Sequence, residues 1–197
     1  MINDKERRLF AVASLALRYP TPDWMESLVA ADLRELSPLA AEATEQLLHF
    51  FAETPLLDLQ MKYVDLFDRK RRAGLHLSYY LNGDTRARGV ALLRFKHIYN
   101  AEGWEPDCQE LPDYLPMLLE FIAVTKSPVA FELLSEHRAG VALLHIALRD
   151  MKSEYAPLMN AILEAIPGDS MGQALKLIAK GPQVELVGLA PYGGGTR

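Results

Sequence analysis

The chain has 197 residues, of which 50% are apolar and 24% charged, the composition of an ordinary soluble globular protein with one sizeable core. The formal net charge of −5 argues against nucleic acid as the main partner and leaves room for a cationic one. A single cysteine, Cys108, excludes a disulfide framework within the chain and any cysteine-rich metal site.

The N-terminal segment predicts a protein that stays in the cytoplasm. Residues 1–8 are charged and lack the apolar core of an export signal. No uncharged apolar run approaches the ~20 residues that a bilayer-spanning helix needs. We therefore expect a cytoplasmic location and no direct membrane insertion.

Helix-start signals recur along the chain. Four times a serine or threonine, a good N-cap, precedes a proline, which suits the first helical position because it has no amide hydrogen to leave unpaired. A helix-forming stretch follows each of these pairs, which are Thr21-Pro22, Ser37-Pro38, Thr54-Pro55 and Ser127-Pro128. We therefore predict a helix start at each of them.

In the N-terminal half, the predicted helices span residues 4–18, 22–35, 38–53 and 55–68. One face of the last of these carries four apolar residues at helical spacing, Leu56, Leu59, Tyr63 and Phe67. Residues 75–81 are ambiguous, because their apolar residues alternate and Asn82-Gly83 follows, which could signal a hairpin. The residues after this turn offer no second strand and resemble the capped, charged start of a helix over 84–102.

In the C-terminal half, helices are predicted over residues 113–125, 128–136, 138–154, 157–166 and 169–180. Two apolar stripes support them: Leu111, Tyr114, Leu115, Leu118, Leu119 and Ile122, then Val141, Leu144, Leu148, Met151 and Tyr155. The pattern predicts an all-α fold, a single-domain helical bundle of about nine to ten helices over residues 1–180. The glycine-rich residues 181–197 are expected to form a mobile tail.

Catalytic motifs are nearly absent. There is no Walker-type phosphate loop and no GxGxxG fingerprint, and no glutamate has a histidine three residues later, as a di-iron bundle requires. Gly168-Asp169-Ser170-Met171-Gly172 fits the GxSxG nucleophile elbow, which needs a strand before it and a histidine after it. A helix is predicted before it and the last histidine is His145, so we interpret it as a turn with Asp169 or Ser170 as an N-cap. We expect no enzymatic activity, no metal site and no cofactor of its own.

The strongest charge feature is Arg69-Lys70-Arg71-Arg72. It is too short for a nucleic-acid patch and lies in an acidic protein. One interpretation is a set of cations that stabilises a helix C-terminus, where the macrodipole is negative. The alternative is that some of these arginines pair with Asp65, Asp68, Glu110 or Asp113 and order a functional loop.

Aromatic and acidic side chains alternate just before this run. Tyr63 and Phe67 lie one turn apart on the same predicted face, flanked by Asp65 and Asp68. The aromatic pair either packs in the core or lines a groove between helices. Asp68 either faces the same groove or pairs internally with Arg71 or Arg72.

A second acidic segment precedes the helix predicted over 113–125. Asp113 is placed to cap that helix, in which Pro116 falls in the first turn and breaks no hydrogen bond. Glu110 stands just before it in a proline-bounded loop, with an open role. Glu120 is seven residues from Asp113 on nearly the same face, so the two could form an acidic strip. The leucines between them are expected in the core.

Two segments resemble a known family. One contains Tyr63-Val64-Asp65-Leu66-Phe67-Asp68, Arg71-Arg72, Leu75-His76-Leu77, Tyr79-Tyr80 and Gly83-Asp84-Thr85-Arg86-x-Arg88-Gly89; the other contains Glu110-Leu111-Pro112-Asp113-Tyr114-Leu115-Pro116 and Leu119-Glu120-Phe121. Together they resemble the NarJ family, the nitrate reductase molybdenum cofactor assembly chaperones, which is similar to the TorD type of redox-enzyme maturation chaperone. The likeness extends loosely over residues 4–180. Tyr114 stands where the wider class often has histidine.

The resemblance implies an all-helical fold without catalysis. It implies binding to the N-terminal peptide of the nitrate reductase catalytic (alpha) subunit, and a delay of membrane docking until the molybdenum cofactor and an iron–sulfur cluster are in place. The cofactor would belong to the client, and proteins of molybdenum cofactor biosynthesis are possible further partners. The candidate client-binding residues are Tyr63, Asp65, Phe67, Asp68, Arg71, His76, Tyr79, Glu110, Asp113, Tyr114 and Glu120.

Two other functions compete with this one. A cofactor-delivery protein would itself hold a molybdopterin or a nucleotide, but no glycine-rich phosphate cradle is visible. A helical hydrolase would use Ser170, against the objections above. The binding chaperone is favoured because a helical protein can offer a groove to a client segment that is disordered alone and helical when bound.

Overall fold

The computed structural model describes residues 2–30, 33, 35–105, 110–168, 172, 176, 177 and 179. Within this part the chain forms ten α-helices, and no strand occurs there. A π-helical turn, η1, and a 3₁₀ turn, η2, lie between α4 and α5. The elements are α1 (Asp4–Ala16), α2 (Trp24–Val29), α3 (Pro38–Glu53), α4 (Leu56–Tyr63), η1 (Val64–Asp68), η2 (Arg71–Ala73), α5 (Leu77–Asn82), α6 (Arg86–Ala101), α7 (Leu115–Thr125), α8 (Pro128–Glu136), α9 (Arg138–Asp150) and α10 (Ala156–Ala165).

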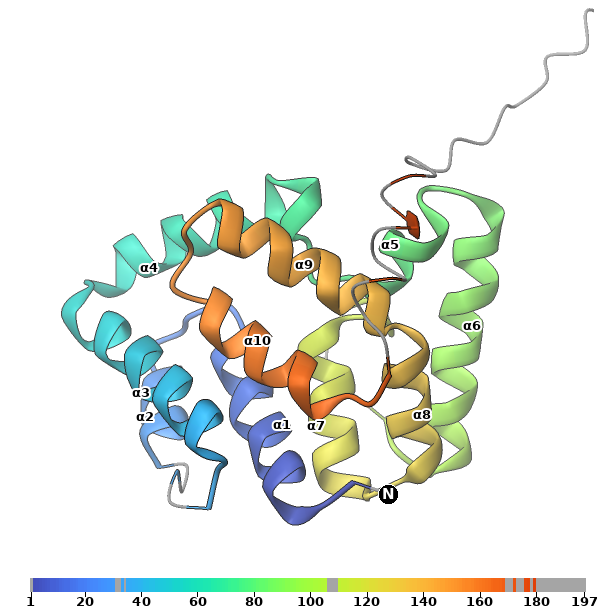
Figure 1. Ribbon diagram of the computed structural model, residues 1–197, viewed down its shortest axis with the longest axis horizontal. Coiled ribbons are helices and arrows are strands. Elements are labelled where there is room, and N and C mark those ends of the chain that lie inside the picture. Colours follow the sequence, from blue (N-terminus) through green and yellow to red (C-terminus); the bar gives the residue numbers. More distant parts are fainter. Residues whose placement is uncertain are drawn as a thin grey trace, which may run out of the picture.

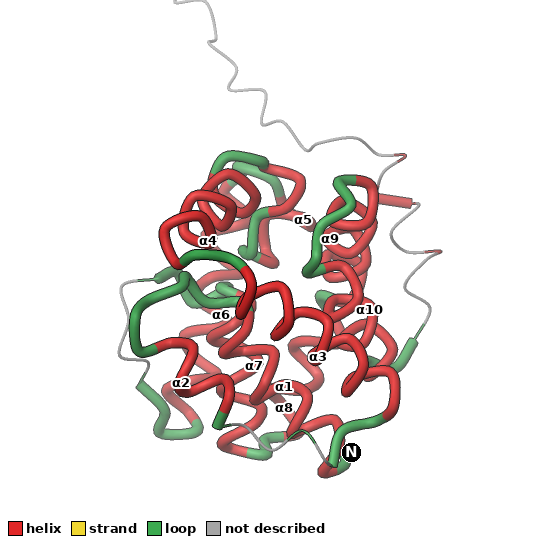
Figure 2. The backbone as a smooth tube through the Cα atoms, turned by 90° about the vertical axis from the view of Figure 1, so that its left-hand side faces the viewer, coloured by secondary structure: helices red, strands yellow, loops and turns green. Residues whose placement is uncertain are grey.

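The helices pack in a bundle around α1 and α7, which lie side by side (Figure 1). α10 packs against α3, α9 and α1, and α9 packs against α5. α6 lies at the edge of the bundle, against α5 and α8, and α4 lies at the opposite side (Figure 1). Figure 2 shows the helices joined directly by loops, so the predicted all-α fold is confirmed for the described residues.

Two of the four predicted caps are confirmed. The Ser37 hydroxyl accepts a hydrogen bond from the Ala40 amide at the start of α3, and Ser127 does the same for Ala130 at the start of α8. Thr54 is wrong as an N-cap, because its hydroxyl donates back to the Phe50 carbonyl and ends α3, and α4 starts after Pro55. Thr21 is also wrong, because α2 begins at Trp24 without a side-chain cap.

Several predicted helix bounds are wrong in instructive ways. The helix predicted over 22–35 shortens to the six residues of α2, and the one over 55–68 changes from α to π geometry at Val64. Residues 77–82 form α5, which the ambiguous pattern did not predict. Of the extended structure that the alternating pattern over 75–81 suggested, the described residues contain one isolated antiparallel bridge, between His76 and Tyr114. The predicted helix over 169–180 and the proposed tail lie largely outside the described residues.

The core contains most of the two predicted stripes, but Leu111 is wrong as a core residue, because it is 43% exposed. Leu115, Leu118, Leu119 and Ile122 have no exposed area, and α7 is therefore enclosed by its neighbours. In the other stripe Val141, Leu144 and Leu148 are fully buried, while Met151 is only partly buried. This enclosed α7 anchors the segment of Glu110, Asp113 and Tyr114 that precedes it.

None of the helices in the described part of the chain is both long enough and apolar enough to cross a bilayer.

Candidate functional site

An open cavity of about 200 Å³ lies where the ends of α1 and α4 meet the segments before α5 and α7. Because four aromatic side chains form much of its wall, we call it the aromatic cavity. Its lining residues are Tyr19, Tyr63, Phe67, Asp68, Leu75, His76, Glu110 and Tyr114. Six of the eleven residues predicted from the sequence therefore lie together in one cavity, although they come from three separate segments.

Two tyrosines join the walls of the aromatic cavity through one backbone carbonyl. The Tyr63 hydroxyl donates to the Leu17 carbonyl at 3.0 Å and lies 2.9 Å from the Tyr114 hydroxyl, which is 3.5 Å from the same carbonyl. Burial raises the pKa of Tyr63 far above its ordinary value, and burial raises the pKa of Tyr114 to about 12. Both phenols therefore keep their protons at physiological pH and serve as hydrogen-bonded spacers between α1, α4 and the segment before α7.

Asp113 is the buried anchor of this region. Its side chain has no exposed area, and one carboxylate oxygen accepts hydrogen bonds from the Ser78 amide at 3.1 Å and the Ser78 hydroxyl at 2.6 Å. The predicted N-cap role at its own helix is wrong, because α7 starts after Tyr114 with no side-chain cap. Asp113 instead caps the start of α5, since Ser78 is the second residue of that helix.

The same carboxylate orients His76. The other oxygen of Asp113 lies 3.2 Å from Nδ1 of His76. Burial alone would raise the pKa of Asp113, but the hydrogen bonds from His76 and Ser78 outweigh it and the net pKa is lowered. A charged Asp113 can only accept a hydrogen bond, so Nδ1 of His76 carries a proton and Nε2 faces the cavity side, 4.0 Å from Glu110.

The imidazole of His76 lies beside Tyr114, the position at which the resemblance described above often has a histidine. Tyr114 occupies that position here, and the His76 ring lies 5.6 Å from the Tyr114 ring, centroid to centroid. The two residues are held together by backbone hydrogen bonds, Leu77 amide to Asp113 carbonyl at 3.1 Å and Leu115 amide to Leu75 carbonyl at 2.8 Å. The sequence alone gave no reason to place position 76 next to position 114.

Two carboxylates at the aromatic cavity lack a strong cationic partner. Among the described residues, no lysine or arginine nitrogen lies within 4.0 Å of Asp68, and Glu110 has only His76 at 4.0 Å. Of the two alternatives for Asp68, the internal pair with Arg71 or Arg72 is therefore wrong, and Asp68 lines the cavity. Within the basic run, Arg69 pairs with Asp65 at 2.7 Å, as one alternative expected, and Arg72 pairs with Asp150 at the end of α9.

A second, more open cavity of about 290 Å³ adjoins the first at Tyr19, which lines both. We call it the apolar cavity, and its other lining residues are Leu57, Gln60, Met61, Val64, Asp65 and Arg69. Leu57 is 66% exposed and Met61 53%, which is high for large apolar side chains. Together the two cavities form a surface with an apolar part and an acidic, aromatic part.

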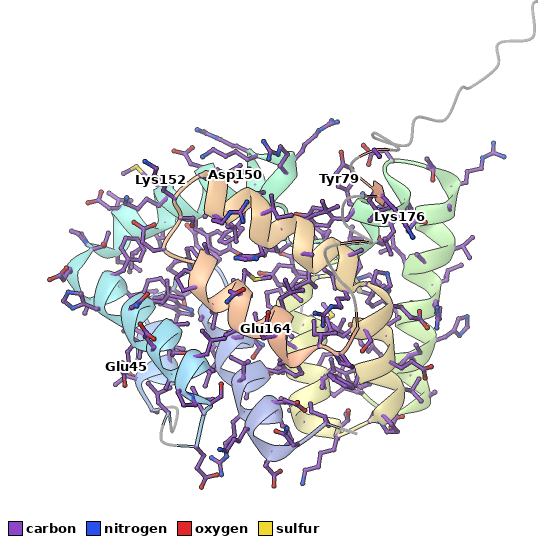
Figure 3. The ribbon with its side chains drawn as sticks, viewed as in Figure 1. Glu45, Tyr79, Asp150, Lys152, Glu164 and Lys176 are labelled. Atoms are coloured by element: carbon purple, nitrogen blue, oxygen red, sulfur yellow. The ribbon has the colours of Figure 1, made fainter. Side chains whose placement is uncertain are left out.

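Four predicted residues line neither cavity. Asp113 does not line the aromatic cavity but contacts its lining residue His76. Glu120 pairs with Arg18 at 2.6 Å. Because Asp113 is buried, the predicted acidic strip of Asp113 and Glu120 does not exist on the surface. Tyr79 lies on α5 beside Tyr80 and Arg88 (Figure 3) and lines neither cavity. Arg71 is exposed and lines neither of them.

Sequence reasoning missed seven of the residues that line the two cavities, which are Tyr19, Leu57, Gln60, Met61, Val64, Arg69 and Leu75. Leu57 and Met61 project from α4 on the side away from Leu59 and Tyr63, so apolar residues off the buried face were a usable signal. Tyr19 and Leu75 carried no such signal, because they lie outside helices. Tyr19 is fixed by an edge-on contact with the Tyr63 ring, at 5.5 Å between centroids.

Comparison with known proteins places the chain in a family. The nitrate reductase delta subunit family matches residues 33–161. A relative from Bacillus subtilis, named "Probable nitrate reductase molybdenum cofactor assembly chaperone NarJ", is 32% identical over 171 residues, which cover 84% of this chain and 92% of the relative. The nitrate reductase molybdenum cofactor assembly chaperone NarJ of Escherichia coli is 34% identical over 123 residues, 60% of this chain and 52% of that protein.

A solved structure supports the fold. The crystal structure of an Archaeoglobus fulgidus protein assigned to redox enzyme maturation superposes with a TM-score of 0.60 at 22% identity, covering 80% of this chain and 91% of the other. The Bacillus subtilis and Escherichia coli relatives are both named as assembly chaperones, in agreement with the prediction of a protein without enzymatic activity. The chain belongs to the nitrate reductase delta subunit family, in its NarJ group of assembly chaperones.

Proposed function

We propose that this chaperone binds the N-terminal segment of the catalytic (alpha) subunit of a respiratory nitrate reductase in the cytoplasm. It holds the segment while the molybdenum cofactor is inserted, and this delays docking of the subunit at the membrane. The client segment lies across the aromatic and the apolar cavity. The observation that carries the proposal is that residues singled out by the sequence come together in an open cavity that continues into exposed apolar side chains.

The surface suits an amphipathic segment with basic residues. Its apolar part offers Leu57, Met61 and Val64, and its acidic part offers Asp68 and Glu110. A short helix lays apolar residues into such a surface and points its cations at the carboxylates. The net charge of −5 for the whole chain adds attraction at longer range.

The energetics favour moderate affinity. Four buried apolar anchors at ~2 kcal/mol each contribute a gross ~8 kcal/mol. Ordering a disordered segment costs ~2–5 kcal/mol, and association costs more. Charge pairing must supply part of the affinity. A complex of this kind forms specifically and still releases its client, as an assembly chaperone requires.

Isothermal titration of the N-terminal peptide of the reductase catalytic subunit against paired variants tests the proposal. Leu57→Ser removes an apolar side chain from the apolar cavity, whereas Leu93→Ser makes the same change on α6, at 58% exposure and on the other side of the molecule (Figure 1). We expect Leu57→Ser to weaken binding roughly tenfold and Leu93→Ser to leave it unchanged. Equal effects of the two variants, or no binding by the wild type, would contradict the proposal.

A further inference from the structure

The polar side chains of the aromatic cavity, the exposed Tyr19 hydroxyl aside, offer a ligand acceptors but no free hydrogen-bond donor. The two buried hydroxyl hydrogens, of Tyr63 and Tyr114, point at the Leu17 carbonyl or at each other. Neither hydrogen is left for a ligand. Asp68 and Glu110 are carboxylates and contribute acceptors alone.

When it is neutral, His76 also offers a ligand an acceptor and no donor. Asp113 holds the proton on Nδ1, so Nε2 carries a lone pair and not a hydrogen. The ring is 31% exposed, so Nε2 can meet a ligand. The cavity thus combines acceptors from three segments with two carboxylates that lack a lysine or arginine partner among the described residues.

The ligand that complements this lining is a group with donors and no acceptor, carried on a stem that tolerates aromatic walls. Arginine and lysine side chains both satisfy the first condition. The guanidinium satisfies the second better, because it is planar, stacks on aromatic faces and spreads its donors toward several acceptors at once. The aromatic walls are formed by the rings of Tyr19, Tyr63, Phe67 and Tyr114.

We infer that the aromatic cavity is a specificity pocket for the guanidinium of a single arginine in the bound client segment. This inference rests on the proposed function and adds to it the identity of the anchoring residue. The apolar cavity then contributes most of the contact area, and the aromatic cavity sets the register of the segment. A segment that lacks a suitably placed arginine binds more weakly, because it covers the carboxylates of Asp68 and Glu110 without giving them a cationic partner.

The test is a double-mutant cycle by calorimetry on the full-length protein. Each arginine of the reductase N-terminal peptide is replaced in turn by citrulline, a neutral isostere, and by lysine. At one position we expect citrulline to weaken binding to the wild type about tenfold, and lysine to weaken it measurably. Against the double variant Asp68→Asn, Glu110→Gln, the same citrulline change should cost less than about twofold.

Glu45→Gln is the charge-matched control, because Glu45 is an exposed residue of α3 that lines neither cavity (Figure 3). Against this variant the full citrulline effect should remain. Additive effects at every position overturn the inference, and so does a peptide in which lysine equals arginine at the sensitive position. If no peptide binds the wild type, the proposed function fails first.

A second measurement tests the cavity without the peptide. In amide NMR spectra of the full-length protein, N-acetylarginine methylamide should give saturable shifts at Asp68, His76 and Tyr114. The citrulline analogue should give none, and the double variant should abolish the arginine effect. Identical spectra with and without the arginine probe at millimolar concentration would contradict the guanidinium pocket, independently of the result of the peptide titrations.

Discussion

Asp113 shows how one buried carboxylate can connect two segments that are far apart in the chain. It lies before α7 and satisfies the amide and hydroxyl of Ser78 at the start of α5, and it fixes the tautomer of His76. The charged form is favoured because all three partners donate to it. The position of His76 in the aromatic cavity therefore depends on a residue that does not line the cavity.

We predict that Asp113→Asn lowers the free energy of unfolding at pH 7 by about 1–3 kcal/mol, because buried donors lose a charged acceptor. The pKa of Asp113 is lowered in the fold, so its contribution is present above the ordinary value of 3.8 and is lost as pH falls below it. In urea titrations below about pH 4, the free energy of unfolding of the variant should therefore fall less steeply with decreasing pH than that of the wild type. Asp84→Asn, at a carboxylate 64% exposed, is the control and should change little.

The tyrosine pair is a second residue-scale case. Tyr63→Phe removes the 3.0 Å hydrogen bond to the Leu17 carbonyl and should cost about 1 kcal/mol in chemical denaturation. Tyr114→Phe should cost less, because its own contact with that carbonyl is 3.5 Å long. The double variant should cost less than the sum, since both single changes remove the shared hydroxyl contact. Strict additivity would show that the two hydroxyls act independently.

At the scale of elements, the π-helical turn η1 positions the site. The predicted helix over 55–68 places Tyr63 and Phe67 on one face, and the structure confirms this contact, with 4.8 Å between ring centroids. η1 contributes Val64 and Asp65 to the apolar cavity and Phe67 and Asp68 to the aromatic cavity. Such turns are rare and frequently occur at functional sites, and no residue pattern in this segment predicted it.

Helix caps offer a test at this scale. Ser37→Ala should lower stability by about 1 kcal/mol, because the Ser37 hydroxyl satisfies the Ala40 amide at the start of α3. Thr21→Ala removes a hydroxyl from an equivalent serine- or threonine-proline pair that caps no helix, and should change stability by less than about 0.5 kcal/mol. Thermal denaturation of the two variants side by side decides this. A larger effect at Thr21 would contradict the assignment of α2.

At the scale of the whole molecule, the aromatic cavity shares residues with the core, whereas the apolar cavity presents side chains that the core does not use. The interior is filled by leucines and aromatics of α1, α7, α9 and α10, while Leu57 and Met61 remain on the surface. Surface residues of this kind contribute little to folding. Their exposure is therefore compatible with selection for binding, and the bundle itself serves as a rigid support for the two cavities.

The division of the proposed binding surface into an apolar part and an acidic part predicts how salt affects binding of the client peptide. Raising the ionic strength from about 0.05 M to about 0.5 M should weaken binding severalfold, because screening shortens the reach of the exposed carboxylates. Leu57→Ser should keep the salt dependence and lower the affinity at every salt concentration. Asp68→Asn should reduce the salt dependence itself. If salt leaves the affinity of the wild type unchanged, charge pairing has no part in recognition.

The sequence by itself determined the helical class, most helix positions and the buried stripes of α7 and α9. These features depend on local hydrogen bonding and on the helical repeat, which are visible in a few consecutive residues. It also grouped Tyr63, Phe67, Asp68, His76, Glu110 and Tyr114 as candidates, through a family resemblance. Their gathering in one cavity could not be read from spacing.

Only the tertiary structure decided which helix Asp113 caps, which carboxylates remain without a cation and where Tyr19 lies. Capping of α5 by Asp113 joins positions 35 residues apart, and the Tyr63–Tyr114 contact joins positions 51 apart. Partners at such distances along the chain are chosen by how the helices pack, because a carboxylate or hydroxyl bonds to whichever donor or acceptor packing brings within about 3 Å.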